Sequence, residues 1–175
     1  MEKDKKKKLL PFILTLAIIL ADQLTKFLIT AFIRENTVGF TLFGDFLRII
    51  HARNPGIAFS MGRDLPDFMR SLLFSILPII VLLILVIYYL KSKELTWTQR
   101  WAIAGILGGG MGNLIDRFFR PSGVVDFIDV KFFGIFGLER WPTFNAADSS
   151  VVVAGLVLVF TFFIREGVGK HEQKS

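Results

Sequence analysis

The sequence contains no cysteine and only two histidines, His51 and His171, among its 175 residues. A chain without cysteine cannot form a disulfide, a thiolate nucleophile or a thiolate metal site. Two histidines this far apart also exclude a histidine-rich metal site and the HExxH zinc helix. We therefore expect no metal and no cofactor.

Charge is scarce within the long apolar runs of the chain. Hydrophobic residues make up 53% of the sequence, and the mean hydropathy is +0.56. This composition is too apolar for a soluble domain of this length and is typical of a small polytopic membrane protein. The net charge of +6 lies largely in lysines at the ends of the apolar runs. That placement favours contact with anionic membrane lipids and argues against nucleic-acid binding.

Four apolar runs are long enough to cross a bilayer, which takes about 20 residues of helix. The lysine-rich start resembles a secretory signal peptide, but no small-x-small cleavage site follows it, so we expect a retained first span. Pro78 lies inside the second span and predicts a kink. Gly108 and Gly112 in the third span form a small-xxx-small pair, which permits close helix packing. The predicted spans are residues 10–29, 69–90, 101–119 and 147–164.

Two mixed segments, residues 34–68 and 120–146, lie between the spans. Apolar and polar residues alternate from Val38 to Leu42, and residues 124–130 also have strand character. Residues 132–141 are rich in aromatic side chains that suit a membrane interface. We predict one polytopic membrane domain over residues 1–175, an all-α membrane protein with four transmembrane helices and a small extramembrane β platform on the membrane surface.

An even number of spans puts both termini on one side of the membrane. The lysine block of residues 3–8, the basic loop before residue 101 and the basic tail all fall on that side, which should be the cytoplasm. The opposite loops also carry arginines, which weakens the rule, and the amino-terminal lysines decide the orientation. The two mixed segments then lie at the outer face.

Ionisable groups inside the spans collect at one depth. Asn113, Asp116 and Arg117 share one face of the third span, and Asp22 and Lys26 are four residues apart in the first. Because lipid offers no hydrogen bonds, these groups should face one another. An intrahelical ion pair with a structural role is the favoured interpretation of Asp22 and Lys26. A structural ion pair and a contact to a substrate carbonyl are equally open for Asp116 and Arg117.

Asp126 and Asp148 are candidates for chemistry because apolar neighbours surround both and neither has a cation at helical spacing. Two crowded carboxylates cannot both ionise, so one keeps its proton while the other stays anionic. Such a pair can activate a water and protonate the leaving group of a peptide bond. Asp148 could instead be only the N-cap of the fourth span.

Three other polar features have plainer interpretations. The turn at Asn54-Pro55-Gly56 is equally consistent with a simple loop and with a site. We expect Asp129 to be a solvated loop carboxylate and His51 to be a surface strand residue.

Five short motifs occur in order along the chain: residues 21–26 (ADQLTK), 54–60 (NPGIAFS), 112–117 (GNLIDR), 124–129 (VVDFID) and 144–149 (FNAADS). With these motifs the chain resembles the bacterial lipoprotein signal peptidases (signal peptidase II), aspartic peptidases of the cytoplasmic (inner) membrane. The resemblance implies removal of signal peptides from diacylglyceryl-modified prolipoproteins, before the lipidated cysteine. It also implies a four-helix bundle with a β cradle and a short interfacial helix, acting as a monomer.

The resemblance assigns the catalytic pair to Asp126 and Asp148. It implies supporting or substrate-binding roles for a further set of polar and glycine residues: Asp22, Lys26, Asn54, Gly56, Asn113, Asp116, Arg117 and Asn145.

Three other functions are weighed against this one. A small proton- or ion-coupled transporter would also use intramembrane acids, but no internal repeat is evident and the acids cluster at one face. A non-enzymatic scaffold is the second rival. A presenilin-type protease needs a Gly-x-Gly-Asp motif, which the sequence Leu42 to Asp45 does not supply.

Overall fold

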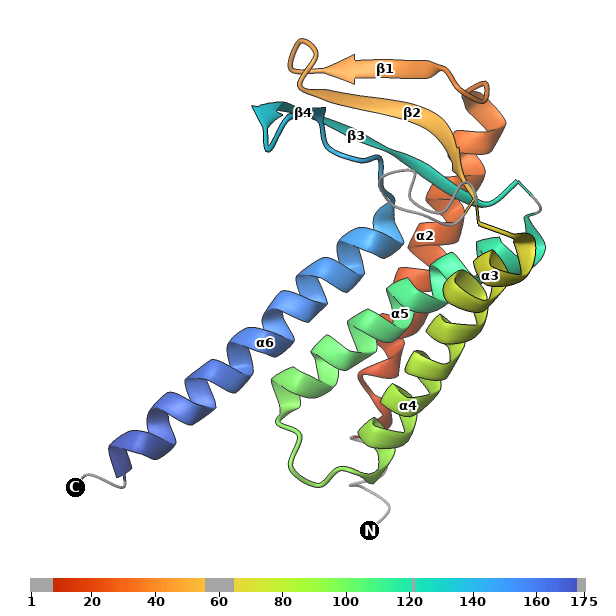
Figure 1. Ribbon diagram of the computed structural model, residues 1–175. Helices are drawn as coiled ribbons and strands as arrows, with labels where there is room; N and C mark the ends of the chain where they lie inside the picture. The colour runs from red at the N-terminus through yellow and green to blue at the C-terminus, as the bar shows by residue number, and fades with distance from the viewer. Residues whose placement is uncertain (1–7, 56–64, 121, 173–175) are drawn as a thin grey trace.

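The computed structural model describes residues 8–55, 65–120 and 122–172 (Figure 1). It is mostly helical, with one small antiparallel sheet across one end of the helices. The helical elements are α2 (Phe12–Phe32), α3 (Asp67–Ser71), the π-helical turn η2 (Leu72–Ile76), α4 (Leu77–Lys91), α5 (Trp97–Phe119) and α6 (Ala146–Glu172). The strands are β1 (Val38–Leu42), β2 (Leu47–Asn54), β3 (Val124–Ile135) and β4 (Leu138–Arg140).

Helix α5 lies at the centre of the bundle and packs against α2, α4 and α6. Glycines make this possible, because a Cβ at Gly108 would come within 2.9 Å of Ile18 on α2. A Cβ at Gly109 would collide with the carbonyl oxygen of Ala147 on α6. The glycines of α5, among them Gly108 of the predicted small-xxx-small pair, therefore let two neighbouring helices approach closely.

Three helices of the described residues are long and apolar enough to cross a membrane: Phe12–Phe32, Phe68–Lys91 and Ala146–Phe163. Helix α5, the predicted third span, is not among them. Its glycines and its inward-facing polar side chains, including buried Gln99, Arg100 and Asp116, lower its hydropathy. That α5 crosses the membrane, and with it the total of four spans, therefore stays a prediction.

The second apolar helix runs from α3 through η2 into α4. Pro78 lies in the first turn of α4, directly after the π-helical turn. Proline has no N–H for the carbonyl four residues earlier, and a π-helical turn is one way for a helix to absorb such a break. The structure therefore has a π-helical turn at this point, and the predicted kink at Pro78 stays a prediction.

The four strands follow one another in the order β1-β2-β3-β4, each antiparallel to the next. The register sets Ala52 of β2 opposite Asp126 of β3, so the sheet fixes where Asp126 lies. Strand β3 extends beyond the predicted residues 124–130, and residues 132–141 form most of the β3–β4 hairpin. The short helix α3 continues into η2, so the separate interfacial helix stays a prediction. Gly56 lies outside the described residues.

Candidate active site

The start of α6 is closed by two side chains that cap each other. Asn145 precedes the helix, and its Oδ1 accepts from the backbone N–H of Asp148 at 2.9 Å. Asp148 reciprocates, since its Oδ2 accepts from the backbone N–H of Asn145 at 3.1 Å. This is a capping box in which Asn145 is the N-cap and Asp148 the third helical residue. The alternative that Asp148 is the N-cap is therefore wrong, although Asp148 does take part in the cap.

Capping occupies only one oxygen of Asp148. Its Oδ1 accepts from Nδ2 of Asn113 on α5 at 2.7 Å. Asp126 on β3 accepts from Nδ2 of Asn145 at 2.8 Å and from Nδ2 of Asn54, at the end of β2, at 2.9 Å. Four elements thus bring together five of the predicted site residues.

Both carboxylates line one cavity of about 680 Å³ at the junction of the sheet with α5 and α6. Its wall combines these polar groups with the apolar rings of Trp141 and Phe144. Such a cavity can hold a polar backbone segment at the carboxylates and apolar groups beside it. The polar lining residues are Asn54, Asn113, Arg117, Asp126, Thr143, Asp148 and Ser149.

The orientations of the Asn113 and Asn145 side-chain amides follow from neighbouring groups that can act only as hydrogen-bond donors. The Lys26 ammonium lies 2.9 Å from Asn113, so the amide atom facing it must be Oδ1. The backbone N–H of Asp148 likewise requires Oδ1 of Asn145. Each amide therefore presents its Nδ2 donor to a carboxylate, Asn113 to Asp148 and Asn145 to Asp126.

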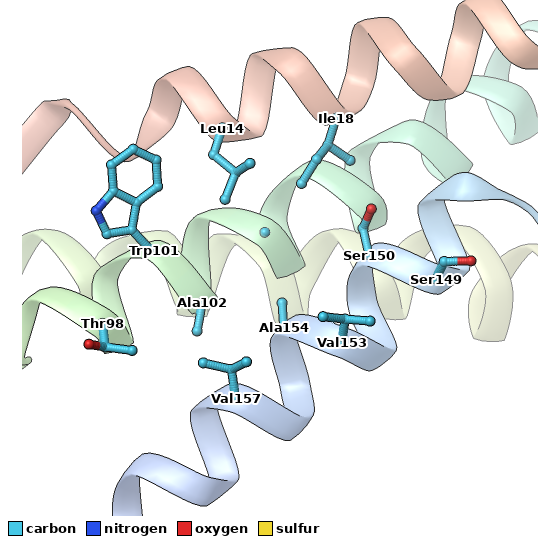
Figure 2. A pocket seen from close by; sticks show the side chains of 11 residues that line it. Leu14, Ile18, Thr98, Trp101, Ala102, Ser149, Ser150, Val153, Ala154 and Val157 are labelled. Atoms are coloured by element: carbon cyan, nitrogen blue, oxygen red, sulfur yellow. The ribbon is translucent and has the colours of Figure 1, made fainter.

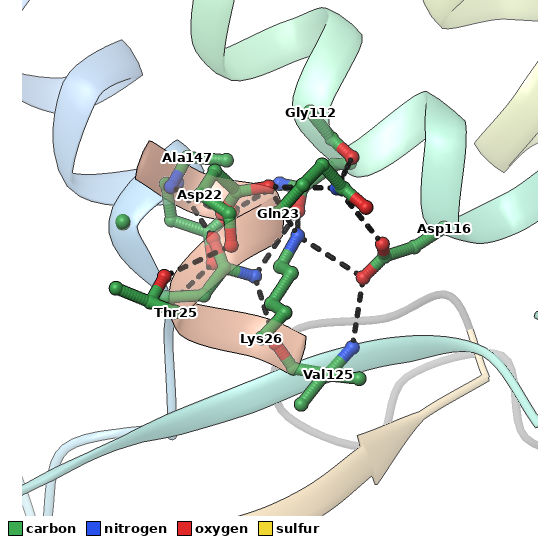
Figure 3. Close-up of polar contacts among 12 residues, drawn as sticks. Asp22, Gln23, Thr25, Lys26, Gly112, Asp116, Val125 and Ala147 are labelled. Carbon is green, nitrogen blue, oxygen red and sulfur yellow. Dashed lines mark hydrogen bonds and ion pairs between the residues drawn. The ribbon is translucent and has the colours of Figure 1, made fainter. Parts of the chain in front are cut away.

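A buried ionic cluster lies directly behind these amides (Figure 3). Lys26 Nζ is 2.8 Å from Asp22 Oδ2 and 3.0 Å from Asp116 Oδ2, and all three side chains are fully buried. Asp22 also accepts from the backbone N–H of Ala147 at 3.0 Å, and Asp116 accepts from that of Val125 at 3.1 Å. The cluster thus fixes the segments beside both Asp148 and Asp126. The predicted Asp22–Lys26 ion pair within α2 is confirmed. Lys26 also links α2 to α5 through Asp116, and Asp22 links α2 to α6 through Ala147.

Two members of this cluster were not predicted. Gln23 Nε2 donates to Asp116 Oδ1 at 3.1 Å and to the carbonyl of Gly112 at 3.0 Å. Arg120 forms an ion pair with Asp116 at 3.4 Å. Gln23 lies in the first of the five motifs, and Arg120 is four residues after Asp116. The place of Gln23 in a motif and the four-residue spacing between Asp116 and Arg120 are therefore the sequence features that could have indicated these contacts.

Asp116 and Arg117 do not form the ion pair considered from the sequence, since Asp116 pairs with Lys26 and Arg120. The Nη1 of Arg117 donates instead to the carbonyl of Phe74 in η2. Pro78, four residues after Phe74, has no N–H to offer that carbonyl. Arg117 also lines the cavity, and within the described part of the chain its buried Nε has no hydrogen-bond partner. It is therefore available to a group entering the cavity.

The plainer interpretations of two residues need correction. Asp129 is a buried residue of β3 and pairs with Arg140 at 2.6 Å, so it is not a solvated loop carboxylate. His51 is on strand β2 as predicted, but it is buried rather than at the surface. Its Nδ1 lies 2.8 Å from the carbonyl oxygen of Ile33. Neither residue lines the cavity that contains Asp126 and Asp148.

The electrostatics of Asp126 favour its protonated form. The pKa of Asp126 is raised from an ordinary 3.8 to about 6, mainly by burial and also by the nearby charge of Asp148, against the lowering effect of the donors Asn54 and Asn145. A proton on Asp126 is thus available close to neutral pH.

A second, almost wholly apolar pocket of about 430 Å³ lies between α2, α5 and α6 (Figure 2). Leu14 and Ile18 of α2 face Val153 and Val157 of α6 across it. Val153 and Ser149 line this pocket and the carboxylate cavity as well. An apolar chain could therefore lie along α6 next to the carboxylates.

Long apolar helices, with two carboxylates in one cavity where the sheet meets α5 and α6, define the class: a helical membrane protein with a candidate active site. Residues 14–164 match the family model described as signal peptidase (SPase) II. The chain belongs to the signal peptidase II family, and it is accordingly a peptidase, a hydrolase.

Named relatives agree with this assignment. The lipoprotein signal peptidase of Treponema denticola is 54% identical over 98% of this chain and 98% of that protein. Those of Treponema pallidum and Borreliella burgdorferi are each 47% identical, over 93% and 90% of this chain and 87% and 92% of theirs.

Two solved structures have a similar fold, and both are described as a bacterial membrane enzyme determined by the in meso method. Each is 30% identical to this chain and covers 87% of it, with TM-scores of 0.73 and 0.72. The matches cover 87% and 91% of those chains.

Proposed function

We propose that this protein removes the signal peptide from diacylglyceryl-modified prolipoproteins and hydrolyses the bond before the lipidated cysteine with Asp126 and Asp148. The observation that carries the proposal is the meeting of these two carboxylates, from distant parts of the chain, in one cavity with fixed donors. The names of the relatives support the substrate class.

The surroundings of the two acids assign them different roles. Both oxygens of Asp148 accept from groups that can only donate toward them, the oriented Asn113 amide and a backbone N–H. Hydrogen bonds of this kind stabilise the anion, so Asp148 is the base. Asp126 is buried with a pKa raised to about 6, so it carries the proton and is the acid.

The reaction then needs only a water between the two carboxylates. Asp148 takes a proton from the water while the water oxygen attacks the scissile carbonyl carbon. At the same time Asp126 gives its proton to the carbonyl oxygen. When the C–N bond breaks, Asp148 passes its proton to the leaving amine and the diol returns a proton to Asp126. The pair is restored without a covalent intermediate.

The remaining features of the cavity suit a lipid-bearing substrate. The buried Nε of Arg117, which has no hydrogen-bond partner among the described residues, can donate to a substrate carbonyl. The apolar pocket that shares Ser149 and Val153 with the cavity can take an acyl chain or part of the apolar signal helix. The enzyme would act as a monomer on a substrate that arrives within the membrane.

The proposed membrane arrangement has α5 as a fourth span within a single domain of residues 1–175. Both termini are then cytoplasmic, the protein lies in the bacterial inner membrane, and Asp126 and Asp148 lie at its outer face. The burial of polar groups of α5 against other helices supports this arrangement, because a central helix needs little apolar surface of its own.

The decisive experiment compares cleavage of a diacylated and an unlipidated prolipoprotein by the purified enzyme. Asp126→Asn and Asp148→Asn should each abolish turnover while the folded protein remains. Asp129→Asn is the matched control, since it removes a buried carboxylate from the same strand as Asp126 but outside the cavity, and it should retain turnover.

Full activity in either dyad variant would refute the aspartic mechanism. Proton flux in liposomes without any cleavage would favour the ion-coupled transporter instead.

A further inference from the structure

Three Phe-Gly pairs in the sheet adopt a backbone conformation that phenylalanine disfavours. In Phe43-Gly44, Phe133-Gly134 and Phe136-Gly137 the phenylalanine φ values are 53°, 56° and 53°, and the glycine values are 72°, 77° and 76°. The left-handed region suits glycine and asparagine, whereas a bulky side chain there is strained. Among the described residues the other non-glycine with positive φ is Asn36, the residue type that this conformation favours.

The three phenylalanines are largely exposed despite their apolar rings. Their exposed fractions are 83% for Phe43, 64% for Phe133 and 91% for Phe136. A single exposed apolar residue needs no explanation, but three that are both strained and exposed break two local rules together. Strain of this kind points to a role in what the side chains meet outside the chain.

These pairs lie at neighbouring tips of the sheet. The ring of Phe46, in the β1–β2 turn, stacks on Phe133 with centroids 6.1 Å apart, and the backbone N–H of Lys131 donates to the carbonyl of Phe46 at 2.7 Å. Figure 1 shows both hairpin tips at the end of the sheet that lies on the side where α6 descends, opposite the end where α2 leads into β1. They form one aromatic edge.

We infer that the Phe-Gly turns insert into the outer boundary of the bilayer and anchor the sheet there. Lipid is the occupant because the sheet lies across one end of the long apolar helices (Figure 1), and aromatic side chains are favoured where such helices leave a bilayer. Lys131 stands 5.7 Å from the Phe133 ring and places a cation beside it, where lipid phosphates lie.

The edge is also connected to the active site. The Phe136 ring lies 6.5 Å from Phe132, and Phe132 lies 5.0 Å from Trp141, which lines the carboxylate cavity. Strand β3 carries both Phe132 and Asp126, and Phe136 directly follows its last residue, Ile135. Anchored tips would therefore hold Asp126 at the membrane depth of the scissile bond, a consequence that rests on the proposed function.

Two triple variants of the full chain separate anchoring from local strain. Replacing Phe43, Phe133 and Phe136 by asparagine relieves the backbone strain but removes the apolar side chains. Replacing the same three by tryptophan keeps the strain and keeps side chains that favour the interface. The asparagine variant should have an unchanged or higher Tm, and its turnover of lipidated substrate in vesicles should fall by roughly tenfold, the order expected from losing part of the apolar burial. The tryptophan variant should retain turnover without a gain in Tm.

Fluorescence locates the edge without reference to activity. The single variant Phe136→Trp, with the signal of the parent's own tryptophans subtracted, should be quenched by lipids brominated near the headgroup and not by aqueous iodide. Iodide quenching without lipid quenching, or equal turnover by the asparagine variant in vesicles, would overturn the inference. Failure of the proposed function is distinguishable, because the parent would then cleave neither in vesicles nor in detergent.

Discussion

A single buried lysine determines how Asn113 meets the carboxylate of Asp148. Lys26 is compensated by Asp22 and Asp116, so its charge is tolerated away from water. Its third contact, to Asn113, turns that amide so that it donates to Asp148. In the proposed mechanism this donor favours Asp148 as the base and leaves the proton on Asp126. The buried Lys26, which does not line the cavity, would thus influence which acid plays which role.

The raised pKa of Asp126 predicts a pH-dependent cost in stability. The folded protein holds this proton more tightly than the unfolded chain, so its favourable contribution is present below about pH 4 and is lost as the pH rises through about 6. Above that, ionised Asp126 costs about 3 kcal/mol of unfolding free energy. Asp126→Asn should therefore gain Tm over the parent between about pH 4 and about pH 8, by roughly 5–10 °C at the upper end. A Tm difference that does not change with pH would contradict this.

Spacing within one helix was enough to predict some of these contacts and not others. Asp22 and Lys26 are four residues apart, so helical geometry alone brings them together. Asp116 and Arg117 are adjacent and project in different directions, and the partner of Asp116 comes from another helix. No local pattern encodes that meeting. The burial of Asp129 and His51 was likewise missed, because it depends on how the strands pair and on what covers the sheet.

The start of α6 is the element on which the site is built. Its capping box positions Asp148, Asp22 accepts from the N–H of Ala147, and Asn145 reaches across to Asp126. Asp126 itself is placed by the pairing of β3 with β2. The sequence predicted this helix and this strand, but the reciprocal cap depends on side-chain geometry that the sequence leaves open. One short turn of helix thus carries both stability and chemistry.

Two substitutions at Asn145 should separate these two contributions. Serine is as good an N-cap as asparagine but has no amide to reach Asp126, whereas alanine provides neither function. Both variants should lose turnover, by roughly 100-fold as for other fixed donors at active sites. Asn145→Ala should in addition be less stable than Asn145→Ser, by about 1 kcal/mol. Measured kcat and Tm together test this, and equal Tm values for the two variants would show that the cap contributes nothing.

Glycines of α5 and α6 offer a matched test of helix packing. A Cβ at Gly109 would meet Ala147 and Val151 of α6, whereas a Cβ at Gly155 would meet nothing within 4 Å. Gly109→Ala should therefore destabilise the protein by about 1–3 kcal/mol through overpacking and displace the start of α6, so turnover falls too. Gly155→Ala should be neutral or stabilise by up to about 1 kcal/mol. Thermal unfolding of both would show it, and equal effects would mean that α5 and α6 do not pack closely.

The whole molecule is arranged around a helix that is not apolar enough to be recognised as a span. Helix α5 buries 12 of its 23 residues against other elements, including Gln99, Arg100 and Asp116. The surrounding helices expose Leu, Val, Ile and Phe outward, as lipid requires. A high mean hydropathy is needed only where side chains face lipid. A central helix that other helices cover can therefore cross a membrane although its own mean hydropathy is low.

The proposed topology can be tested in cells because the chain has no native cysteine. Lys93→Cys marks the loop between α4 and α5, and Glu139→Cys marks the exposed β4 strand. If α5 spans the membrane and the termini are cytoplasmic, a membrane-impermeant maleimide added to spheroplasts should label Glu139→Cys and leave Lys93→Cys unlabelled until the membrane is permeabilised. The cysteine-free parent is the background control, and retained cleavage activity shows that each variant is inserted correctly. Labelling of both positions from outside would mean that α5 does not separate them, and the reverse pattern would invert the orientation drawn from the amino-terminal lysines.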